Sequence, residues 1–235
     1  MNMYKRILLK LSGESISADD FPYSAEKLDD LADQIRQIKD MGVQIGIVIG
    51  GGNICRGKLF EKLGFDRVQS DYAGMLGTVI NSLMLGAKLN QIGIKTTVMS
   101  AVQAESVPMF DKDEANRLLD EGEVMIFGGG VGKPYHSTDT GSAQRAIDIN
   151  ADVILMAKSG VDGVYDSDPD TNPNAKRFDE LTFDDILNLE LKVIDLQAAE
   201  LCKDAGIEAF VFNMSGKDNI VKAVKGETTG TVIKC

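Results

Sequence analysis

The sequence predicts an α/β protein built on a mostly parallel β-sheet. Short apolar runs alternate with amphipathic stretches along the chain, which is typical of βαβ units. The length of 235 residues fits one large domain or two small ones. Because no low-complexity linker divides the chain, we expect a single domain over residues 1–235.

Seven apolar runs have the length and composition of β-strands. They are Lys5–Leu11, Val43–Ile49, Ile94–Met99, Glu123–Phe127, Val153–Ala157, Glu208–Asn213 and Thr231–Lys234. Helices are expected to fill much of the space between these strands.

Two of the helices have a clear apolar periodicity. Residues Ala25–Met41 repeat apolar side chains at three- and four-residue spacing, and Gly42 is placed to end this helix in the left-handed conformation. The stretch Tyr72–Leu89 repeats the pattern, with Asp71 placed to cap it. The segment Gly160–Phe178 is rich in Asp, Pro and Asn, so we expect a long functional loop there.

Composition excludes several classes of function. The chain has 25 Lys+Arg against 36 Asp+Glu, and this net charge of −11 argues against a nucleic-acid or anionic-membrane partner. A single histidine, His136, leaves no His-rich metal site and only one route to a Ser-His-Asp triad. Cys55, Cys202 and Cys235 are far apart with no C-x-x-C pair, which predicts a reduced, cytosolic protein. No apolar run approaches the ~20 residues that span a bilayer.

Glycine-rich turns follow three of the predicted strands. Ser12-Gly13 follows the first strand, Gly50-Gly51-Gly52 the second and Gly128-Gly129-Gly130-Val131-Gly132 the fourth. Ligands of open α/β sheets bind at the carboxyl ends of the strands, where glycines let backbone N–H groups approach an anion. Tight strand–helix turns are the alternative explanation. Neither glycine run fits a Walker A loop or the G-x-G-x-x-G dinucleotide motif.

Two basic residues accompany these turns. Lys10 lies near the end of the first predicted strand, and Arg56 follows the second glycine turn. Cations beside glycine amides are what a transferring phosphoryl group requires, because the charge on its oxygens must be stabilised. A solvated edge-strand lysine is the alternative for Lys10.

Several blocks of sequence carry a family resemblance. They are Lys10–Glu14 (K-L-S-G-E), Val48–Gly57 (V-I-G-G-G-N-x-x-R-G), Asp71–Asn81 (D-x-x-G-M-L-x-T-x-x-N), Ser137–Thr140, Val161–Pro169 and Leu191–Asp195. In this order they closely resemble the bacterial UMP kinases (uridylate kinases) of the amino-acid-kinase family. With a compatible tail through Asn213, the resemblance covers nearly the whole chain. It implies a three-layer α/β/α sandwich with a mostly parallel central sheet.

The resemblance also implies an activity. Members of this group transfer a phosphoryl group from Mg²⁺-bound ATP to UMP, in line and without a covalent intermediate, in pyrimidine nucleotide biosynthesis. We therefore expect ATP and UMP as substrates, Mg²⁺ with the ATP, no protein-held metal, and a cytoplasmic homohexamer. The N-terminal part would bind mainly the acceptor, and the part from about residue 150 mainly ATP.

Site residues carry over by position. Lys10, Arg56 and Asp139 would be catalytic. The ATP site would comprise Lys10, Leu11, Ser12, Gly13, Gly52, Arg56, Ser159, Tyr165 and Asp168. The UMP site would comprise Gly51, Asp71, Val131, Gly132, Lys133, Pro134, Tyr135, His136, Ser137 and Thr138. Asp139, with Asp195 as a second candidate, would orient Lys10, although an acidic helix start equally explains Asp195.

This chain departs from the group in two places. The segment of residues 15–23 is short and lacks glycine. Many relatives have a glycine-rich segment there that is linked to activation by GTP. We therefore do not expect GTP to activate this protein. Val131 and Lys133 stand in place of the Thr and Asn of A-G-T-G-N-P. The first change removes a hydroxyl and the second adds a cation near the UMP pocket.

Two alternatives remain. One is a kinase of the same fold that acts on a carboxylate, a carbamate or isopentenyl phosphate. Isopentenyl phosphate kinases use a His shortly after the glycine turn, where this chain has Arg56, and carboxylate kinases do not need the Asp71 block. The other is a catalytically silent nucleotide-binding regulator. Binding alone would tolerate the loss of Lys10, Arg56 or Asp139, so their joint presence favours an enzyme.

Overall fold

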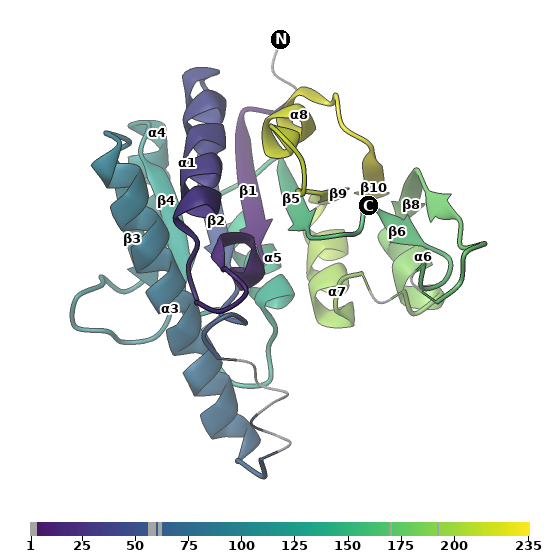
Figure 1. Cartoon of the computed structure of the whole chain (residues 1–235), viewed down its shortest axis with the longest axis horizontal. Coiled ribbons are helices and arrows are strands. Elements are labelled where there is room, and N and C mark those ends of the chain that lie inside the picture. The colour runs from purple at the N-terminus through teal and green to yellow at the C-terminus, as the bar shows by residue number, and fades with distance from the viewer. Residues whose placement is uncertain (1–3, 56–59, 61–62, 170, 192) are drawn as a thin grey trace.

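The computed structural model describes residues 4–55, 60, 63–169, 171–191 and 193–235. Its main sheet is formed by β1 (Arg6–Leu11), β2 (Gln44–Ile49), β3 (Thr96–Ser100), β4 (Val124–Gly128), β5 (Val153–Lys158), β8 (Glu180–Thr182), β9 (Glu208–Asn213) and β10 (Gly230–Lys234). The strand order is β3-β4-β2-β1-β5-β9-β10-β8 (Figure 1). Every pairing from β3 to β9 is parallel, and β10 is antiparallel to β9. The predicted mostly parallel sheet is therefore confirmed.

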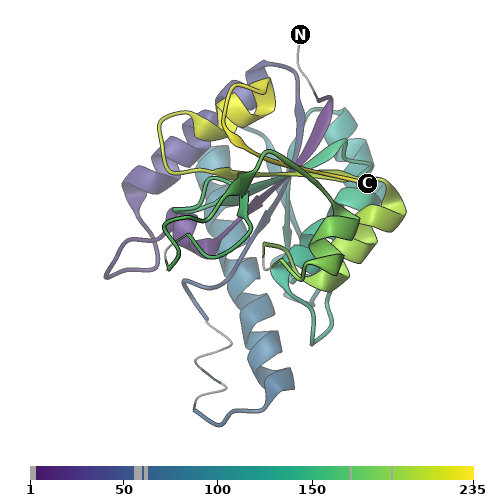
Figure 2. The same ribbon diagram turned by 90° about the vertical axis from the view of Figure 1, so that its right-hand side faces the viewer.

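Helices cover both faces of this sheet. They are the 3₁₀ turn η1 (Gly13–Ile16) and the helices α1 (Ala25–Asp40), α3 (Arg67–Gln91), α4 (Lys112–Asp120), α5 (Thr138–Asp148), α6 (Phe183–Asn188), α7 (Leu196–Ala205) and α8 (Asn219–Lys225). One apolar core lies between the sheet and α1, α3 and α8, and a second lies between the sheet and α4, α5, α6 and α7. Figure 2 shows the resulting three layers. The predicted α/β/α sandwich is confirmed.

The pleat of β1 decides which way Lys10 faces. Alternate side chains of a strand point to opposite faces of the sheet. Leu9 and Leu11 belong to the core beneath α1, whereas Leu8 belongs to the core beneath α5. Lys10 is two residues from Leu8 and so faces the α5 layer. On the neighbouring strand β5, Met156 belongs to that same core, which puts Lys158 on the same face as Lys10.

The helix that was expected over Tyr72–Leu89 begins earlier. It starts at Arg67, and the side chain of Asp66 accepts a hydrogen bond of 3.2 Å from the Gln69 N–H. Asp66 is therefore the cap, and the expected capping role of Asp71 was wrong, because Asp71 lies inside the helix. The expected left-handed residue after α1 is confirmed, since Gly42 has φ +81°.

The segment Gly160–Phe178 is not entirely loop. It contains the antiparallel pair β6 (Val164–Tyr165) and β7 (Arg177–Phe178). The Val164 N–H donates to the Thr231 hydroxyl over 2.8 Å, which ties this pair to β10. Strands of two residues are too short to produce an alternating pattern, which is why the sequence predicted only a loop.

Candidate active site

The order in which the chain adds strands to the sheet reverses between β1 and β5. From β1 the chain builds the sheet outward through β2 to β4 and β3, and then crosses back to add β5 and β9 on the other side of β1. A crevice forms at the carboxyl ends of parallel strands where such a reversal occurs. The glycine turn after β2, Lys10 near the end of β1 and Lys158 at the end of β5 all lie at this edge.

A buried ion pair lies at the centre of this edge. The Lys10 Nζ atom is 2.6 Å from Asp139 Oδ1, and only 8% of Lys10 is exposed. Asp139 is in the first turn of α5, where Ser137 caps the helix by accepting the Asp139 N–H over 2.9 Å. Burial alone would raise the pKa of Asp139, but the charges of Lys10 and Lys158 outweigh it and hold that pKa below its usual value. The carboxylate is therefore ionised at neutral pH.

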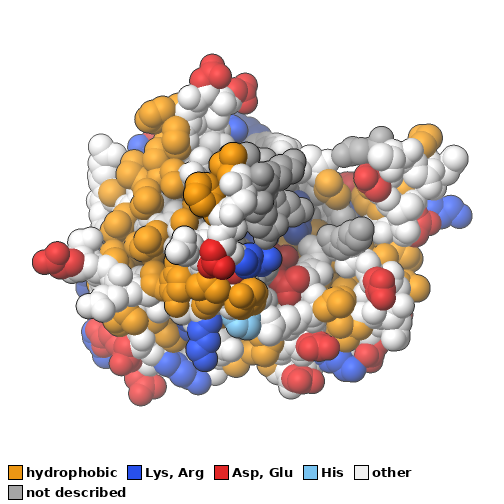
Figure 3. Space-filling model, turned by 90° about the horizontal axis from the view of Figure 1, so that it is seen from below, with side chains coloured by type: hydrophobic (Ala, Val, Ile, Leu, Met, Phe, Trp, Pro, Cys, Tyr) orange, Lys and Arg blue, Asp and Glu red, His pale blue; other side chains and the backbone are white. Residues whose placement is uncertain are grey.

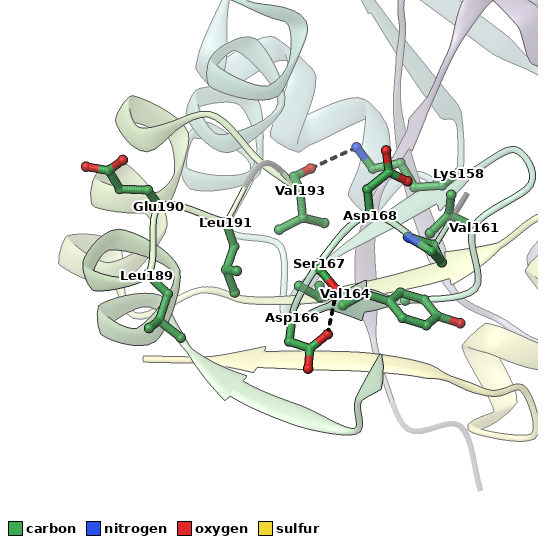
Figure 4. Close-up of a pocket in the computed structure, with 13 residues that line it drawn as sticks. Lys158, Val161, Val164, Asp166, Ser167, Asp168, Leu189, Glu190, Leu191 and Val193 are labelled. Carbon is green, nitrogen blue, oxygen red and sulfur yellow. Dashed lines mark hydrogen bonds between the residues drawn. The ribbon is translucent and has the colours of Figure 1, made fainter. Parts of the chain in front are cut away.

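Lys158 is a site residue that the sequence reasoning missed. Its Nζ atom donates to the Val193 carbonyl over 2.9 Å (Figure 4). Burial and the nearby charge of Lys10 lower the pKa of Lys158, while Asp139 opposes this shift. The available signal was the same one that singled out Lys10, a lysine at the carboxyl end of an otherwise apolar strand.

The glycines of the turn after β2 serve two purposes. A Cβ atom on Gly51 would lie 2.8 Å from the Gly74 carbonyl oxygen and 2.9 Å from the Thr78 nitrogen, so this glycine lets the turn approach α3. A Cβ atom on Gly52 would meet nothing within 4 Å. Close packing thus explains Gly51, whereas Gly52 borders open space that a ligand can enter.

Asparagine side chains hold this turn in place. Buried Asn81 on α3 donates to the Gly50 carbonyl and to Asn53 Oδ1, each over 2.7 Å. Asn53 in turn donates to the Pro22 carbonyl over 2.8 Å. Nearby, after β1, the Ser12 hydroxyl is one of the buried side-chain polar atoms without a partner in the described part of the chain. An unpaired buried hydroxyl costs about 1–3 kcal/mol, which a ligand oxygen would offset.

The first cavity at this edge has a volume of about 510 Å³ and is called the acceptor cavity below. The turn after β2, α3 and the loop between β4 and α5 line it. Of the residues expected to bind UMP, it is lined by Gly51, Asp71, Val131, Lys133, His136, Ser137 and Thr138, and Gly52 also lines it. Gly132, Pro134 and Tyr135 belong to the same loop without lining the cavity. The structure thus brings most of this set together.

The second cavity, of about 530 Å³, is called the donor cavity below (Figure 4). Lys158, Tyr165 and Asp168 line it. Figure 4 shows Leu189, Glu190 and Leu191 on the side opposite Lys158 and Asp168. The Tyr165 hydroxyl donates to Asp162 over 2.6 Å.

Several other predicted residues line neither cavity. Those at the end of β1 and the start of α5 lie at the same edge of the sheet, and they are Lys10, Leu11, Ser12, Gly13 and Asp139. Ser159 is exposed and lines a different cavity, together with Ser215 and Lys217, so the structure does not bring it together with Tyr165 and Asp168. Asp195 caps α7 by accepting the Ala198 N–H over 2.8 Å, and it also accepts from the Ser137 and Thr140 hydroxyls. Arg56 lies outside the described residues.

Over the described ranges, no group of three or more His, Cys, Asp or Glu side chains is arranged to hold a metal ion. Nor does any helix in that part of the chain have the length and hydropathy to cross a membrane.

Comparison with known proteins identifies the class of this protein. Residues 5–213 match the amino acid kinase family. The chain belongs to this family and is a phosphotransferase.

Solved structures similar to this chain narrow the comparison from the family to one kind of kinase. The UMP kinase of Bacillus anthracis superposes with a TM-score of 0.94 at 40% identity, over 98% of this chain and 96% of the relative. The UMP kinase of Ureaplasma parvum gives a TM-score of 0.94 at 38% identity, over 98% and 99% of the two chains. The uridylate kinase of Archaeoglobus fulgidus gives a TM-score of 0.76 at 32% identity, over 97% of this chain and 99% of the relative. The resemblance to UMP kinases is confirmed.

Proposed function

We propose that this protein is a UMP kinase, which transfers the γ-phosphoryl group of Mg–ATP to UMP and yields UDP and ADP. One observation carries the proposal beyond the likeness to relatives: residues beside the buried Lys10–Asp139 pair line both cavities. Lys158 lines the donor cavity, and Thr138, the neighbour of Asp139, lines the acceptor cavity. Each cavity lies within the roughly 300–1,000 Å³ of small-ligand sites.

In this mechanism the protein positions two nucleotides and stabilises charge. Lys10 and Lys158 would neutralise the oxygens of the transferring phosphoryl group, and Asp139 would hold Lys10 in place. The unpartnered Ser12 hydroxyl would contact ATP phosphates, with Leu11, Gly13 and Gly52 beside them. Arg56, which follows the glycine turn, would bridge donor and acceptor. No histidine base is needed, since a phosphate monoester has a second pKa of about 6 and is mostly ionised at pH 7.

The two substrates would occupy different parts of one domain. Gly51, Asp71 and residues 131–138 would bind UMP, with Asp71 accepting hydrogen bonds from sugar hydroxyls. Tyr165 and Asp168 would line the adenosine site, in the part of the chain from about residue 150. Mg²⁺ would enter with ATP as part of the substrate and neutralise charge that develops on the phosphates.

We propose further that the protein is a cytoplasmic homohexamer in which α3 makes a subunit contact. One face of α3 exposes apolar side chains at helical spacing, and this stripe consists of Tyr72, Leu76, Ile80, Leu83 and Met84. Figure 3, seen from below, shows apolar side chains gathered on the left, the side where Figure 1 draws α3. A contiguous apolar patch of this kind is typical of an interaction surface.

A coupled assay of the purified protein tests the function. ADP release is measured with Mg–ATP and a panel of nucleoside monophosphates, carboxylates, carbamate and isopentenyl phosphate. UMP is expected to give the highest kcat/KM. A preference for a carboxylate, carbamate or isopentenyl phosphate would assign the protein to another branch of the fold. Nucleotide binding without turnover on any acceptor would identify a regulator.

A further inference from the structure

The Asp71 carboxylate in the acceptor cavity is held by two groups of the protein. Arg67 donates through Nε to both carboxylate oxygens, over 2.9 and 3.0 Å. The Tyr135 N–H donates to Oδ2 over 2.7 Å. The Asp71 side chain is 16% exposed and that of Arg67 is 50% exposed. The two groups come from different elements, α3 and the loop between β4 and α5.

Helix stability does not account for an arginine at this position. Arg67 is the first residue of α3, and the first turn of this helix has no acidic residue. A cation at a helix N-terminus opposes the helix dipole. An ion pair with the cation on the N-terminal side of the anion is also the less favourable order at i,i+4 spacing. The pairing of Arg67 with Asp71 instead places both side chains in the lining of the acceptor cavity.

The loop residue in this arrangement has a strained backbone. Tyr135 has φ +67°, in the left-handed region that non-glycine residues rarely adopt. This conformation directs its N–H at Asp71, and the Arg67 guanidinium lies 5.8 Å from the centre of its ring. Such strain persists where surrounding contacts hold it, and it is concentrated at functional sites. Asp71 and Arg67 supply those contacts here.

We propose that Arg67 is a positioning residue for the acceptor nucleotide, acting through Asp71. A carboxylate has about four lone-pair sites, so the contacts with Arg67 and Tyr135 leave room for a sugar hydroxyl. By fixing the plane of the carboxylate, Arg67 aims the remaining site into the cavity. This inference rests on the proposed function, in which Asp71 binds the ribose of UMP.

A double-mutant cycle tests the proposal. A hydrogen bond to a charged group contributes about 1.5–3 kcal/mol, and 1.4 kcal/mol corresponds to a tenfold change in affinity. Arg67→Met should therefore raise the KM for UMP by about tenfold. We expect kcat and the KM for ATP to change by less than about twofold. Asp71→Asn should likewise weaken the binding of UMP more than the binding of ATP. If Arg67 acts through Asp71, the double variant has the same KM for UMP as Asp71→Asn alone. Arg67→Lys, which keeps the charge but not the planar geometry, should recover part of the loss.

Arg117→Met is the matched control. Arg117 is a half-exposed arginine on α4 that pairs with Glu114 and Glu121, and its loss should leave both KM values unchanged. The Tm of Arg67→Met should match that of the wild type. The proposal would be overturned if the two single-variant increases in the KM for UMP multiplied in the double variant. It would also be overturned if Arg67→Met raised the KM for ATP as much as the KM for UMP.

The wild-type assay decides the proposed function separately. If the wild type prefers another nucleotide acceptor, that result overturns the UMP assignment. The same cycle is then measured on the preferred acceptor and still decides the role of Arg67.

Discussion

The Lys10 ammonium lies 2.6 Å from the Asp139 carboxylate, and this contact joins the middle of the sheet to the first turn of α5. Lys158, on the next strand, faces the same layer and shares the field of both groups. Two lysines thus face one carboxylate at the edge where the glycine turn ends. This arrangement is suited to the oxygens of a transferring phosphoryl group.

The first prediction concerns Lys10. Lys10→Met should lower kcat by about 10²–10³, the usual cost of removing a group that stabilises transition-state charge. Circular dichroism should show an intact fold, because Lys158 still faces Asp139. Lys203→Met, which removes an exposed lysine paired with Asp184, is the control and should keep full activity. Near-normal turnover of Lys10→Met would remove Lys10 from the mechanism.

The second prediction is a pH dependence set by Lys158. Its pKa is lowered from the ordinary 10.5, so its ammonium loses its proton at a lower pH than an exposed lysine does. We expect kcat/KM for ATP to fall as the pH rises through this lowered value. Lys158→Arg, which stays charged, should move the alkaline limb to higher pH. An unmoved limb would mean that another group titrates there.

The same shift affects stability in the opposite direction. The unfolded chain binds the Lys158 proton more tightly than the folded protein does. The contribution of Lys158 to the free energy of unfolding therefore rises with pH between its folded and unfolded pKa values. Denaturant titrations of the wild type and of Lys158→Met across this range measure the difference.

The third prediction separates the two glycines. Gly51→Ala should lower the free energy of unfolding by about 1–3 kcal/mol, because its Cβ atom would overlap α3 backbone atoms. Gly52→Ala has open space around the new methyl group and should leave stability unchanged, while raising KM for the nucleotides that approach there. Thermal melts and steady-state kinetics of the two variants provide the comparison. Equal losses of stability would contradict this division of roles.

The fourth prediction concerns the apolar stripe of α3. Replacing Leu76 and Ile80 by Glu places charges on the exposed face, so the assembly should dissociate into smaller species in sedimentation velocity experiments. Leu196→Glu changes a similarly exposed leucine on α7 and should leave the assembly intact. An unchanged sedimentation coefficient in the α3 variant would exclude this face from the subunit contact.

Much of the fold was predictable because its signals are local. Apolar runs such as Val43–Ile49 and Glu208–Asn213 are strands at nearly the expected bounds. The start of α3 was not predicted, since Asp66 and Asp71 are both acceptable caps and only the backbone path distinguishes them. The β6–β7 pair depends on Thr231, a residue distant in sequence, and no local pattern reports such a contact.

The sequence by itself determined seven of the eight strands described in the main sheet, the glycine turns and the family, because periodicity, composition and motif spacing are properties of neighbouring residues. The three-residue strand β8 and the β6–β7 pair were not predicted, since they are too short to show a periodicity. Tertiary structure decided which side chains meet. Lys10, Asp139 and Lys158 come from three separate elements, and only the strand order and the pleat bring their charges together. It also decided that Arg67 and Tyr135 converge on Asp71 and that Ser159 lies elsewhere. These relationships depend on distances in space, which spacing along the chain does not encode.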